Sequence, residues 1–179
     1  MNYIIFDLEA TCEDNEKIPN SEIIEIGAIR LNENLEEVGR FNQFIKPIFR
    51  PTLSAFCKKL TTIKQEEVDN AKLFPVVIQE YENWILEKVP VILYSWGSYD
   101  KNQILRESEQ KGYNGKIKSI LENHRNLKED YRIAMKTKAE GMTKALKECG
   151  LKLEGTHHRG IDDAINIANI FRVVKRKIG

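Results

Sequence analysis

The hydrophobic residues of this chain change their spacing near residue 74, and this change constrains the fold more than any other feature. Before it lie three short apolar runs, at residues 3–8, 22–31 and 40–45, which are typical of β-strands. After it, apolar side chains recur at the three- and four-residue steps of one helix face: Phe74, Val77, Ile78, Tyr81 and Ile85. Strands followed by helices predict a layered α/β domain.

The rest of the chain extends this α/β pattern. The remaining predicted elements are a buried strand at 91–94 and helices at 100–111, 142–149 and 161–177. Residues 126–138 fit either a helix or a short strand followed by a helix. Because the chain has no repeat and no linker-like stretch, residues 1–179 are predicted to form a single domain.

The composition excludes several classes of protein. The 28 Lys and Arg residues balance 27 Asp and Glu residues, so the chain is no polycation, and any nucleic-acid site has to be local. No apolar run reaches the ~18 residues of a spanning helix, and Asp7 comes too early for a signal peptide. Three cysteines without a CxxC pair indicate reduced thiols. We therefore expect a cytoplasmic protein that does not contact a membrane.

Two acids lie at the end of the first predicted strand. Asp7 and Glu9 are two residues apart, so strand geometry places both side chains on one face, at the carboxyl end. Ligand sites in α/β sheets favour this edge. The alternative is a solvated strand end. Glu25 is also an acid in a predicted strand, but nothing in the sequence aligns it with these two.

The last predicted helix begins with two adjacent acids. Helical steps align Asp162 with Asn166 and Asn169, and align Asp163 with an apolar face. We therefore expect Asp163 to point inward, where a carboxylate is costly unless a metal or a hydrogen-bond donor meets it. The helix macrodipole explains an acid such as Asp162 at an N-terminus, and it is the alternative explanation for Asp163.

Further candidates lie in turns that lead into helices. Asp100 follows the strand predicted at 91–94, and N-capping is the alternative reason for an Asp there. His157 and His158 occupy a glycine-flanked loop before the last helix. A neutral imidazole beside acids is a suitable general base near pH 7. The alternative for both histidines is a solvated loop.

Four converging carboxylates would need a counter-charge. Two unit charges 4 Å apart repel by about 4 kcal/mol at an effective dielectric of 20. Divalent cations reverse the sign of that energy, and oxygen ligands select Mg²⁺ or Mn²⁺ over zinc. If Asp7, Glu9, Asp100 and Asp163 converge, we expect two Mg²⁺ ions there, with Mn²⁺ as a substitute. Such a pair suits displacement at a phosphodiester.

Three stretches in order resemble the motifs of the DEDDh (DnaQ-like) 3′→5′ exonuclease family. They are residues 6–12 (FDLEATC), 95–100 (SWGSYD) and 155–163 (GTHHRGIDD). Within that family the sequence most resembles the histone-mRNA 3′-end and enhanced-RNAi exonucleases and the KapD-like subgroup. Supporting stretches are residues 22–27, 53–61 and 141–150. The likeness runs from about residue 1 to residue 170.

The resemblance implies an RNase H-like three-layer fold, with a mixed sheet of about five strands flanked by helices. It also implies site residues. The metal-binding acids are matched by Asp7, Glu9, Asp100 and Asp163, and the general base by His158. His157 and Asp162 have the same spacing as His158 and Asp163, but the helix-face count and the family's His-x-Gly-Ile-Asp-Asp pattern favour the second pair.

The resemblance also implies contacts with the substrate. Glu9 and Ala10 match positions that meet the terminal nucleotide, with Glu9 reaching the 3′-hydroxyl, and Thr11 and His158 are also expected to contact the substrate. Tyr99 has an aromatic position beside Asp100 and is expected to stack on a base or sugar. A packing role is the alternative for Tyr99.

These observations predict a metal-dependent exonuclease that releases nucleoside 5′-monophosphates from the 3′ end of single-stranded RNA or DNA by a two-metal mechanism. One alternative is an endonuclease of the same fold. Another is a non-catalytic nucleotide-binding module, although binding alone does not require five catalytic-type groups. The residues identify no protein partner.

Overall fold

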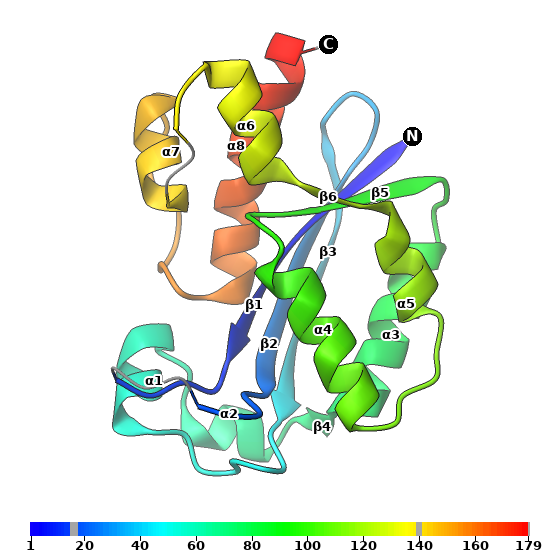
Figure 1. Cartoon of the computed structure of the whole chain (residues 1–179), viewed down its shortest axis with the longest axis vertical. Helices are drawn as coiled ribbons and strands as arrows, with labels where there is room; N and C mark the ends of the chain where they lie inside the picture. The colour runs from blue at the N-terminus through cyan, green and yellow to red at the C-terminus, as the bar shows by residue number, and fades with distance from the viewer. Residues whose placement is uncertain (15–17, 139–140, 179) are drawn as a thin grey trace.

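A six-stranded mixed sheet lies at the centre of the structure (Figure 1). The structure is a computed structural model that describes residues 1–14, 18–138 and 141–178. The strands are β1 (Asn2–Ala10), β2 (Ile23–Leu31), β3 (Glu37–Lys46), β4 (Lys72–Leu73), β5 (Val91–Ser95) and β6 (His124–Asn126). Their order across the sheet is β4-β3-β2-β1-β5-β6. The pairs β1–β2 and β2–β3 are antiparallel, whereas β5 runs parallel to both β1 and β6, and β4 runs parallel to β3.

Helices cover both faces of this sheet, which makes three layers. One face is covered by α3 (Phe74–Leu86), α4 (Tyr99–Gln110) and α5 (Ile117–Ile120), the last followed by a 3-10 turn, η1 (Leu121–Asn123). The other face is covered by α6 (Leu127–Met135), α7 (Met142–Glu148) and α8 (Gly160–Ile178). Two short helices, α1 (Ala55–Thr61) and α2 (Gln65–Asp69), lie beyond the carboxyl end of β1 (Figure 1).

Strand β1 divides its side chains between the two layers. Ile4, Phe6 and Leu8 belong to the core under α3, α4 and α5. Ile5 belongs to the core under α6, α7 and α8. Because successive strand side chains alternate between faces, Asp7 and Glu9 share the face of Ile5. The acids of β1 therefore face the layer that contains α8.

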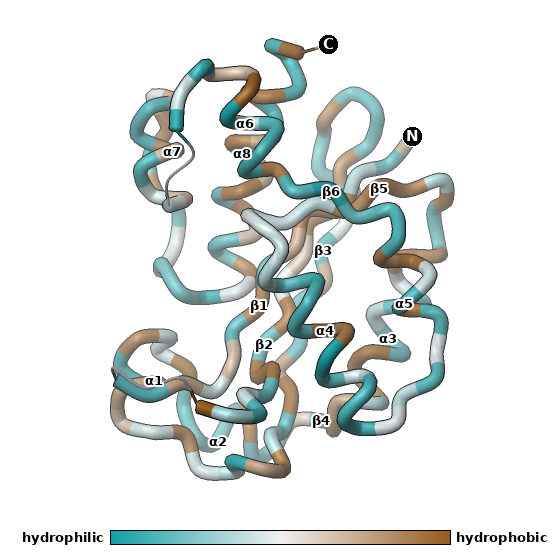
Figure 2. Tube along the Cα trace, in the orientation of Figure 1, coloured by the Kyte–Doolittle hydropathy of each residue, from teal (hydrophilic) through white to brown (hydrophobic). Residues whose placement is uncertain are grey.

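Hydrophobic burial explains most of the predicted elements. The five apolar residues predicted on one face of a helix are all fully buried in α3, and Pro75 lies in its first turn. In Figure 2 hydrophobic residues gather where strands and helices meet. The strands predicted at 3–8, 22–31, 40–45 and 91–94 are confirmed as β1, β2, β3 and β5. Residues 126–138 adopt the second alternative, with β6 preceding α6.

The structure also adds elements that the hydrophobic pattern does not predict. Two short edge strands, β4 and β6, bring the sheet from the four strands predicted individually to six. The predicted α/β class, with a mixed sheet flanked by helices, is confirmed. Within the described ranges, no helix combines the length and the apolar character needed to cross a membrane.

Candidate active site

The acids of β1 meet the start of α8 because two glycines let the backbones approach. A Cβ atom added to Gly27 of β2 would overlap the backbone of Gly160 and Ile161. A Cβ atom on Gly160 would lie 3.2 Å from the Gly27 nitrogen and 3.3 Å from the Asp7 carbonyl oxygen. Only glycine permits this contact. This close contact of Gly27 with Gly160 lets the first turn of α8 pack directly on strands β1 and β2. As a result, Asp163 lies near Asp7 and Glu9.

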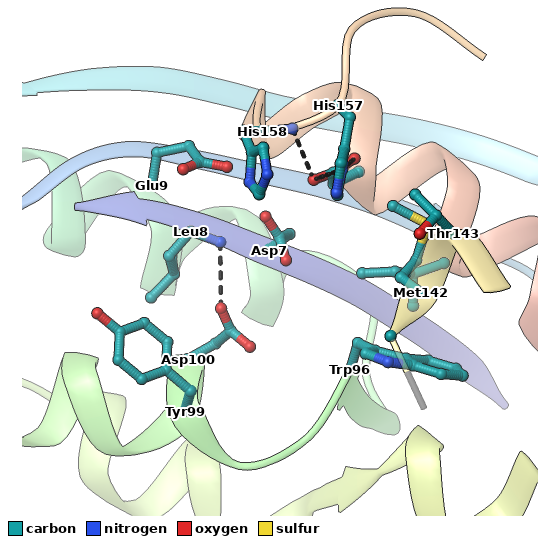
Figure 3. A pocket seen from close by; sticks show the side chains of 13 residues that line it. Asp7, Leu8, Glu9, Trp96, Tyr99, Asp100, Met142, Thr143, His157 and His158 are labelled. Carbon is teal, nitrogen blue, oxygen red and sulfur yellow. Dashed lines mark hydrogen bonds and ion pairs between the residues drawn. The ribbon is translucent and has the colours of Figure 1, made fainter. Parts of the chain in front are cut away.

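Three of the four predicted metal ligands converge closely. Asp7, Glu9 and Asp163 each offer a carboxylate oxygen, and these oxygens all lie within 4.8 Å of one another. Asp163 is 5% exposed and Glu9 is 9% exposed. The three carboxylates line a cavity of about 320 Å³ (Figure 3).

Asp100 lies in the same cavity but outside that close group. It belongs to the first turn of α4, and its Oδ1 atom accepts a hydrogen bond from the Leu8 N–H at 3.3 Å. Burial is the main reason that the pKa of Asp100 rises to about 6. Figure 3 shows Asp100 approaching the cavity from the side opposite the histidines.

The two histidines both lie against Asp163. The Nδ1 atom of His157 is 3.0 Å and 3.1 Å from the two Asp163 oxygens, and the backbone N–H of His158 donates to Asp163 Oδ2 at 3.0 Å. The two imidazole rings stack with centroids 3.8 Å apart. Burial and the neighbouring His157 lower the pKa of His158, against an opposing effect of Asp163. A lowered pKa keeps this imidazole neutral near pH 7.

Asp162 organises the loop instead of facing the cavity. Its Oδ2 atom accepts from the Thr156 N–H at 2.8 Å, and its carboxylate fills the space that a Cβ atom on Gly155 would need. Gly155 has φ +68° and His158 has φ +65°, both in the left-handed region. As the helix-face count predicts, Asp163 is the acid that points inward. The face of α8 that carries Asp162, Asn166 and Asn169 was predicted to be polar, but it is not fully exposed. Asn166 is buried and hydrogen-bonded to the Glu154 backbone.

The electrostatics of the cavity fit a divalent cation. Burial is the largest cause that raises the pKa of Asp7, followed by the charges of Asp100, Glu9, Asp163 and Glu25. Burial and the same kind of repulsion raise the pKa of Glu9 to about 9. An all-oxygen set of mutually repelling carboxylates is the donor chemistry of Mg²⁺ and Mn²⁺ sites.

Glu25 helps to position the active-site residues, and the sequence alone does not indicate this role. It pairs directly with Glu9 across the β1–β2 ladder and is fully buried. Its carboxylate accepts from Arg159 Nε at 3.1 Å, from Arg159 Nη2 at 3.3 Å and from the Gly160 N–H at 3.0 Å. This contact fastens the histidine loop and the start of α8 to the sheet. Only the strand register, which sequence periodicity does not give, aligns Glu25 with Glu9.

The residues predicted to contact substrate are divided between the cavity and its surroundings. Tyr99 is 55% exposed and lines the cavity beside Asp100. Ala10 ends β1, and its carbonyl accepts from the Cys57 thiol at 3.8 Å. The Thr11 hydroxyl accepts from the Glu22 N–H at 2.9 Å, so it already has a structural partner. The cavity is also lined by Trp96, Met142, Thr143 and Ile167. The first three lie in stretches that carry the family resemblance, and Ile167 lies on the helix face predicted to include Asp163.

Comparison with known proteins identifies the family and the fold of the chain. A family model described as exonuclease (RNase_T) matches residues 4–171 of the chain. The chain therefore belongs to this exonuclease family. Its six-stranded sheet with flanking helices is the RNase H-like fold of the exonucleases it resembles.

Three of the proteins that the chain resembles are named as exoribonucleases or as a nuclease domain. ERI1 exoribonuclease 2 of Xenopus laevis is 29% identical over 189 residues, which cover 93% of this chain and 27% of the relative. The 3′-5′ exoribonuclease 1 of Rattus norvegicus is 33% identical over 175 residues, covering 93% and 50%. The nuclease domain of 3′hExo, a DEDDh family member bound to rAMP, has a TM-score of 0.90 and 30% identity, covering 98% of this chain and 92% of that one. The chain spans about a quarter to a half of the length of these two curated relatives.

Proposed function

We propose that this chain is a metal-dependent 3′→5′ exonuclease that acts on single-stranded RNA or DNA and releases nucleoside 5′-monophosphates. The main support for this proposal is the convergence of carboxylates at one site. Carboxylates from two segments more than 150 residues apart, Asp7 and Glu9 on β1 and Asp163 on α8, offer oxygens within 4.8 Å of one another beside two histidines. A fold that gathers these charges without an ion loses stability, so a catalytic use explains why they are there.

Divalent cations would be held by Asp7, Glu9 and Asp163, with Asp100 on the α4 side of the cavity. Mg²⁺ is the proposed cofactor, as two ions, and Mn²⁺ is the proposed substitute. When bound, such a pair activates a water molecule and neutralises charge that develops on the phosphate oxygens. The pKa values of Asp7 and Glu9 are raised by burial and by repulsion from the neighbouring carboxylates, and a bound cation would relieve this repulsion.

The proposed general base is His158. Its lowered pKa leaves the imidazole unprotonated near neutral pH, so it is ready to take a proton from the attacking water. The water oxygen bonds to phosphorus, the bond from phosphorus to the 3′ oxygen of the preceding nucleotide breaks, and solvent protonates that oxygen. Asp163 holds the His158 backbone in place through the 3.0 Å hydrogen bond.

The proposed substrate is a nucleic-acid 3′ end. The names of the relatives support RNA, and the similar 3′hExo domain was solved with rAMP. Glu9 and Ala10 are proposed to meet the terminal nucleotide, with Thr11 next to them. Tyr99, exposed at the rim, is proposed to stack on it.

The domain and cellular assignments are part of the same proposal. We infer that residues 1–179 form a single exonuclease domain, which is supported by the one central sheet and by the family match over residues 4–171. A cytoplasmic location stays a prediction, and cell fractionation with an antibody against the chain tests it.

The test uses 5′-labelled single strands of RNA and DNA with Mg²⁺, with Mn²⁺ and with a chelator. We expect a ladder of products that shorten one nucleotide at a time from the 3′ end, and no products with chelator. Asp163→Asn should abolish the ladder, and the matched control Glu80→Gln, on the surface of α3, should keep it. No shortening under any metal condition would refute the proposal.

A 3′-phosphate-blocked strand separates the two enzymatic alternatives. An exonuclease that recognises a free 3′-hydroxyl degrades the blocked strand far more slowly than the free one. Equal rates would support an RNase H-like endonuclease. If the protein binds strands but never shortens them, the non-catalytic binding module is supported instead.

A further inference from the structure

A buried serine and a partly buried histidine lie behind the turn that leads to Asp100. Ser95 ends β5 and is fully buried, and His124 begins the neighbouring strand β6. Their side chains meet, with the Ser95 Oγ atom 2.9 Å from the His124 Nε2 atom. Neither residue is among the described residues that line the cavity. Any effect of this pair on the site therefore has to pass through another residue.

The Ser95 hydroxyl holds the turn between β5 and α4. It donates to the Gly97 carbonyl at 3.0 Å, and the Gly97 N–H donates back to the Ser95 carbonyl at 3.0 Å. Gly97 has φ +109°, so the turn uses a conformation that favours glycine. Tyr99 and Asp100 follow at once, in the first turn of α4 (Figure 3). The Ser95 hydroxyl therefore helps to set the direction in which α4 presents Asp100 to the cavity.

Ser95 also acts on Asp100 electrostatically. Burial raises the pKa of Asp100, and hydrogen bonds, among them one from the Ser95 side chain, oppose that rise. The Leu8 N–H, 3.3 Å from the Asp100 Oδ1 atom, has the same effect. These donors favour the ionised carboxylate, which is the form that binds a cation. The proton of Ser95 thus points toward the turn and the acid that follows it.

The direction of this proton determines the tautomer of His124. Burial and the nearby Lys101 lower the pKa of His124 to about 4, so the ring is neutral at pH 7 and has one N–H. If Ser95 donated to His124, the Ser95 oxygen and the Gly97 carbonyl would be two acceptors 3.0 Å apart with no proton between them. His124 therefore donates from Nε2, and Ser95 accepts. The Phe6 ring packs edge-on against this imidazole, with centroids 5.8 Å apart.

We propose that His124 and Ser95 are positioning residues for Asp100. The Nε2–H group of His124 donates to Ser95, and the Ser95 hydroxyl holds the turn that places Asp100 on the α4 side of the metal cavity. The hydrogen-bond chain does not depend on the proposed function, whereas its effect on metal binding and turnover rests on it.

The hydrogen-bond chain is tested by the tautomer of His124. Long-range ¹H–¹⁵N NMR of the full chain at pH 7 distinguishes the two tautomers, and His124→Gln identifies the His124 signals among those of the three histidines. We expect the proton on Nε2. A proton on Nδ1 would overturn the proposal, because Nε2 would then be an acceptor and would take the hydrogen bond from Ser95.

The positioning role is tested by calorimetric titration with Mn²⁺, which requires no turnover. His124→Leu removes the donor, whereas His124→Gln keeps an N–H group in its place. We expect the Mn²⁺ affinity to fall at least about tenfold in His124→Leu, as after loss of an outer-shell partner of a metal ligand, and to be largely restored in His124→Gln. The matched control Glu122→Gln, at an exposed position of η1, should bind Mn²⁺ like the wild type.

Thermal melts establish that each of these variants is folded. Unchanged Mn²⁺ affinity in folded His124→Leu would overturn the positioning role. An equal loss of affinity in His124→Gln and His124→Leu would also overturn it, because the donor would then not be the feature that matters.

Turnover provides the second test of positioning. His124→Leu should lower kcat at least about tenfold with little change in the KM for the strand, because Asp100 shifts while the residues that line the cavity remain. Ser95→Ala should lower kcat at least as much, and the double variant should lose no more than Ser95→Ala, since both residues act through one hydroxyl. Losses that multiply in the double variant would overturn the chain. A wild type that neither binds Mn²⁺ nor shortens strands would refute the proposed function, while the NMR result would still decide the hydrogen-bond chain.

Discussion

At the scale of single residues, Glu9 shows how a functional group can oppose stability. Its side chain is 9% exposed, and burial and neighbouring carboxylates raise its pKa to about 9. Without an ion, a charged Glu9 adds repulsion to Asp163, Glu25 and Asp100. A residue that only supports the fold would not have such surroundings.

Glu9→Gln should therefore separate activity from stability. We expect nuclease activity to fall by about a hundredfold or more, because a metal ligand is lost. The melting temperature of the metal-free protein at pH 7 should rise, because Glu9, with its pKa raised to about 9, has to take up a proton on folding at this pH, and Gln removes that cost. Product ladders and thermal melts in chelator measure the two effects. A variant that is less stable and fully active would contradict this account of Glu9.

The raised pKa values also predict a pH dependence for the metal-free protein. A carboxyl whose pKa is raised on folding stabilises the folded state most below its unfolded pKa, and this contribution is lost as the pH rises through the folded pKa. Asp100 titrates at about 6 and Glu9 at about 9. Their unfolded values are 3.8 and 4.5, so the melting temperature in chelator should fall from about pH 4 to about pH 9, with Asp100 contributing up to about pH 6 and Glu9 over the whole range.

Two comparisons check the origin of that fall in melting temperature. Saturating Mn²⁺ should reduce it, because the ion compensates the charges that develop. Glu9→Gln should also reduce it, because one titrating group is gone. An equal fall in the wild type and in Glu9→Gln would show that Glu9 does not titrate in this range.

At the scale of elements, the site depends on how α8 is docked on the sheet. The Gly27–Gly160 contact allows the approach, and the ion pair of Glu25 with Arg159 fixes it. The guanidinium group of Arg159 also lies over the Phe44 ring of β3, at 5.3 Å. This arrangement holds Asp163 against the acids of β1.

Arg159→Met should test this docking. Loss of charge-assisted hydrogen bonds to a buried carboxylate should lower the free energy of unfolding by about 1–3 kcal/mol. We also expect a lower kcat per folded molecule with KM changed little, because Asp163 and the histidines shift. Urea denaturation and steady-state kinetics measure these quantities.

The double variant Glu25→Gln/Arg159→Met provides the control for the ion pair. The single Arg159→Met variant leaves the buried Glu25 carboxylate without its guanidinium partner, and the double variant removes this charge. The free energy of unfolding of the double variant should therefore be higher than that of Arg159→Met. Strictly additive losses in the two single variants would contradict a coupled pair.

Sequence periodicity predicts the elements that bury a regular apolar face, and it misses those set by specific contacts. β1, β2 and α3 have such faces and were predicted. The short α1 was missed because it is set by a cap, in which the Ser54 hydroxyl accepts from the Cys57 N–H. β4 and β6 are two and three residues long, and only their pairing with β3 and β5 defines them.

The candidate site was predictable to the extent that it consists of motifs. Asp7, Glu9 and Asp163 were predicted from face counting, and the structure brings them together. Glu25 was not aligned with them, because its place depends on cross-strand register. The histidine contact with Asp163 depends on a left-handed residue, His158, which spacing does not reveal.

At the scale of the whole molecule, the fold brings the carboxyl end of the first strand, β1, against the start of the last helix, α8. β1 begins at residue 2 and α8 ends at residue 178, yet both contribute to one cavity. Metal binding should therefore stabilise the entire fold, because the ion joins elements that are distant along the chain.

Mn²⁺ should accordingly raise the melting temperature of the protein in a concentration-dependent manner. A ligand at a hundred times its Kd contributes about 2.7 kcal/mol when it binds only the folded state. Differential scanning calorimetry over a range of Mn²⁺ concentrations measures the effect. Asp163→Asn should lose most of the rise, and Glu80→Gln should keep it.

The most direct measurement is anomalous diffraction from crystals grown with Mn²⁺ and a nucleoside 5′-monophosphate. The account predicts two anomalous peaks in the cavity, with oxygens of Asp7, Glu9, Asp163 and Asp100 at about 2.1 Å from one ion or the other. Saturating Mn²⁺ that gives no peak among these carboxylates, or peaks only elsewhere, would contradict it.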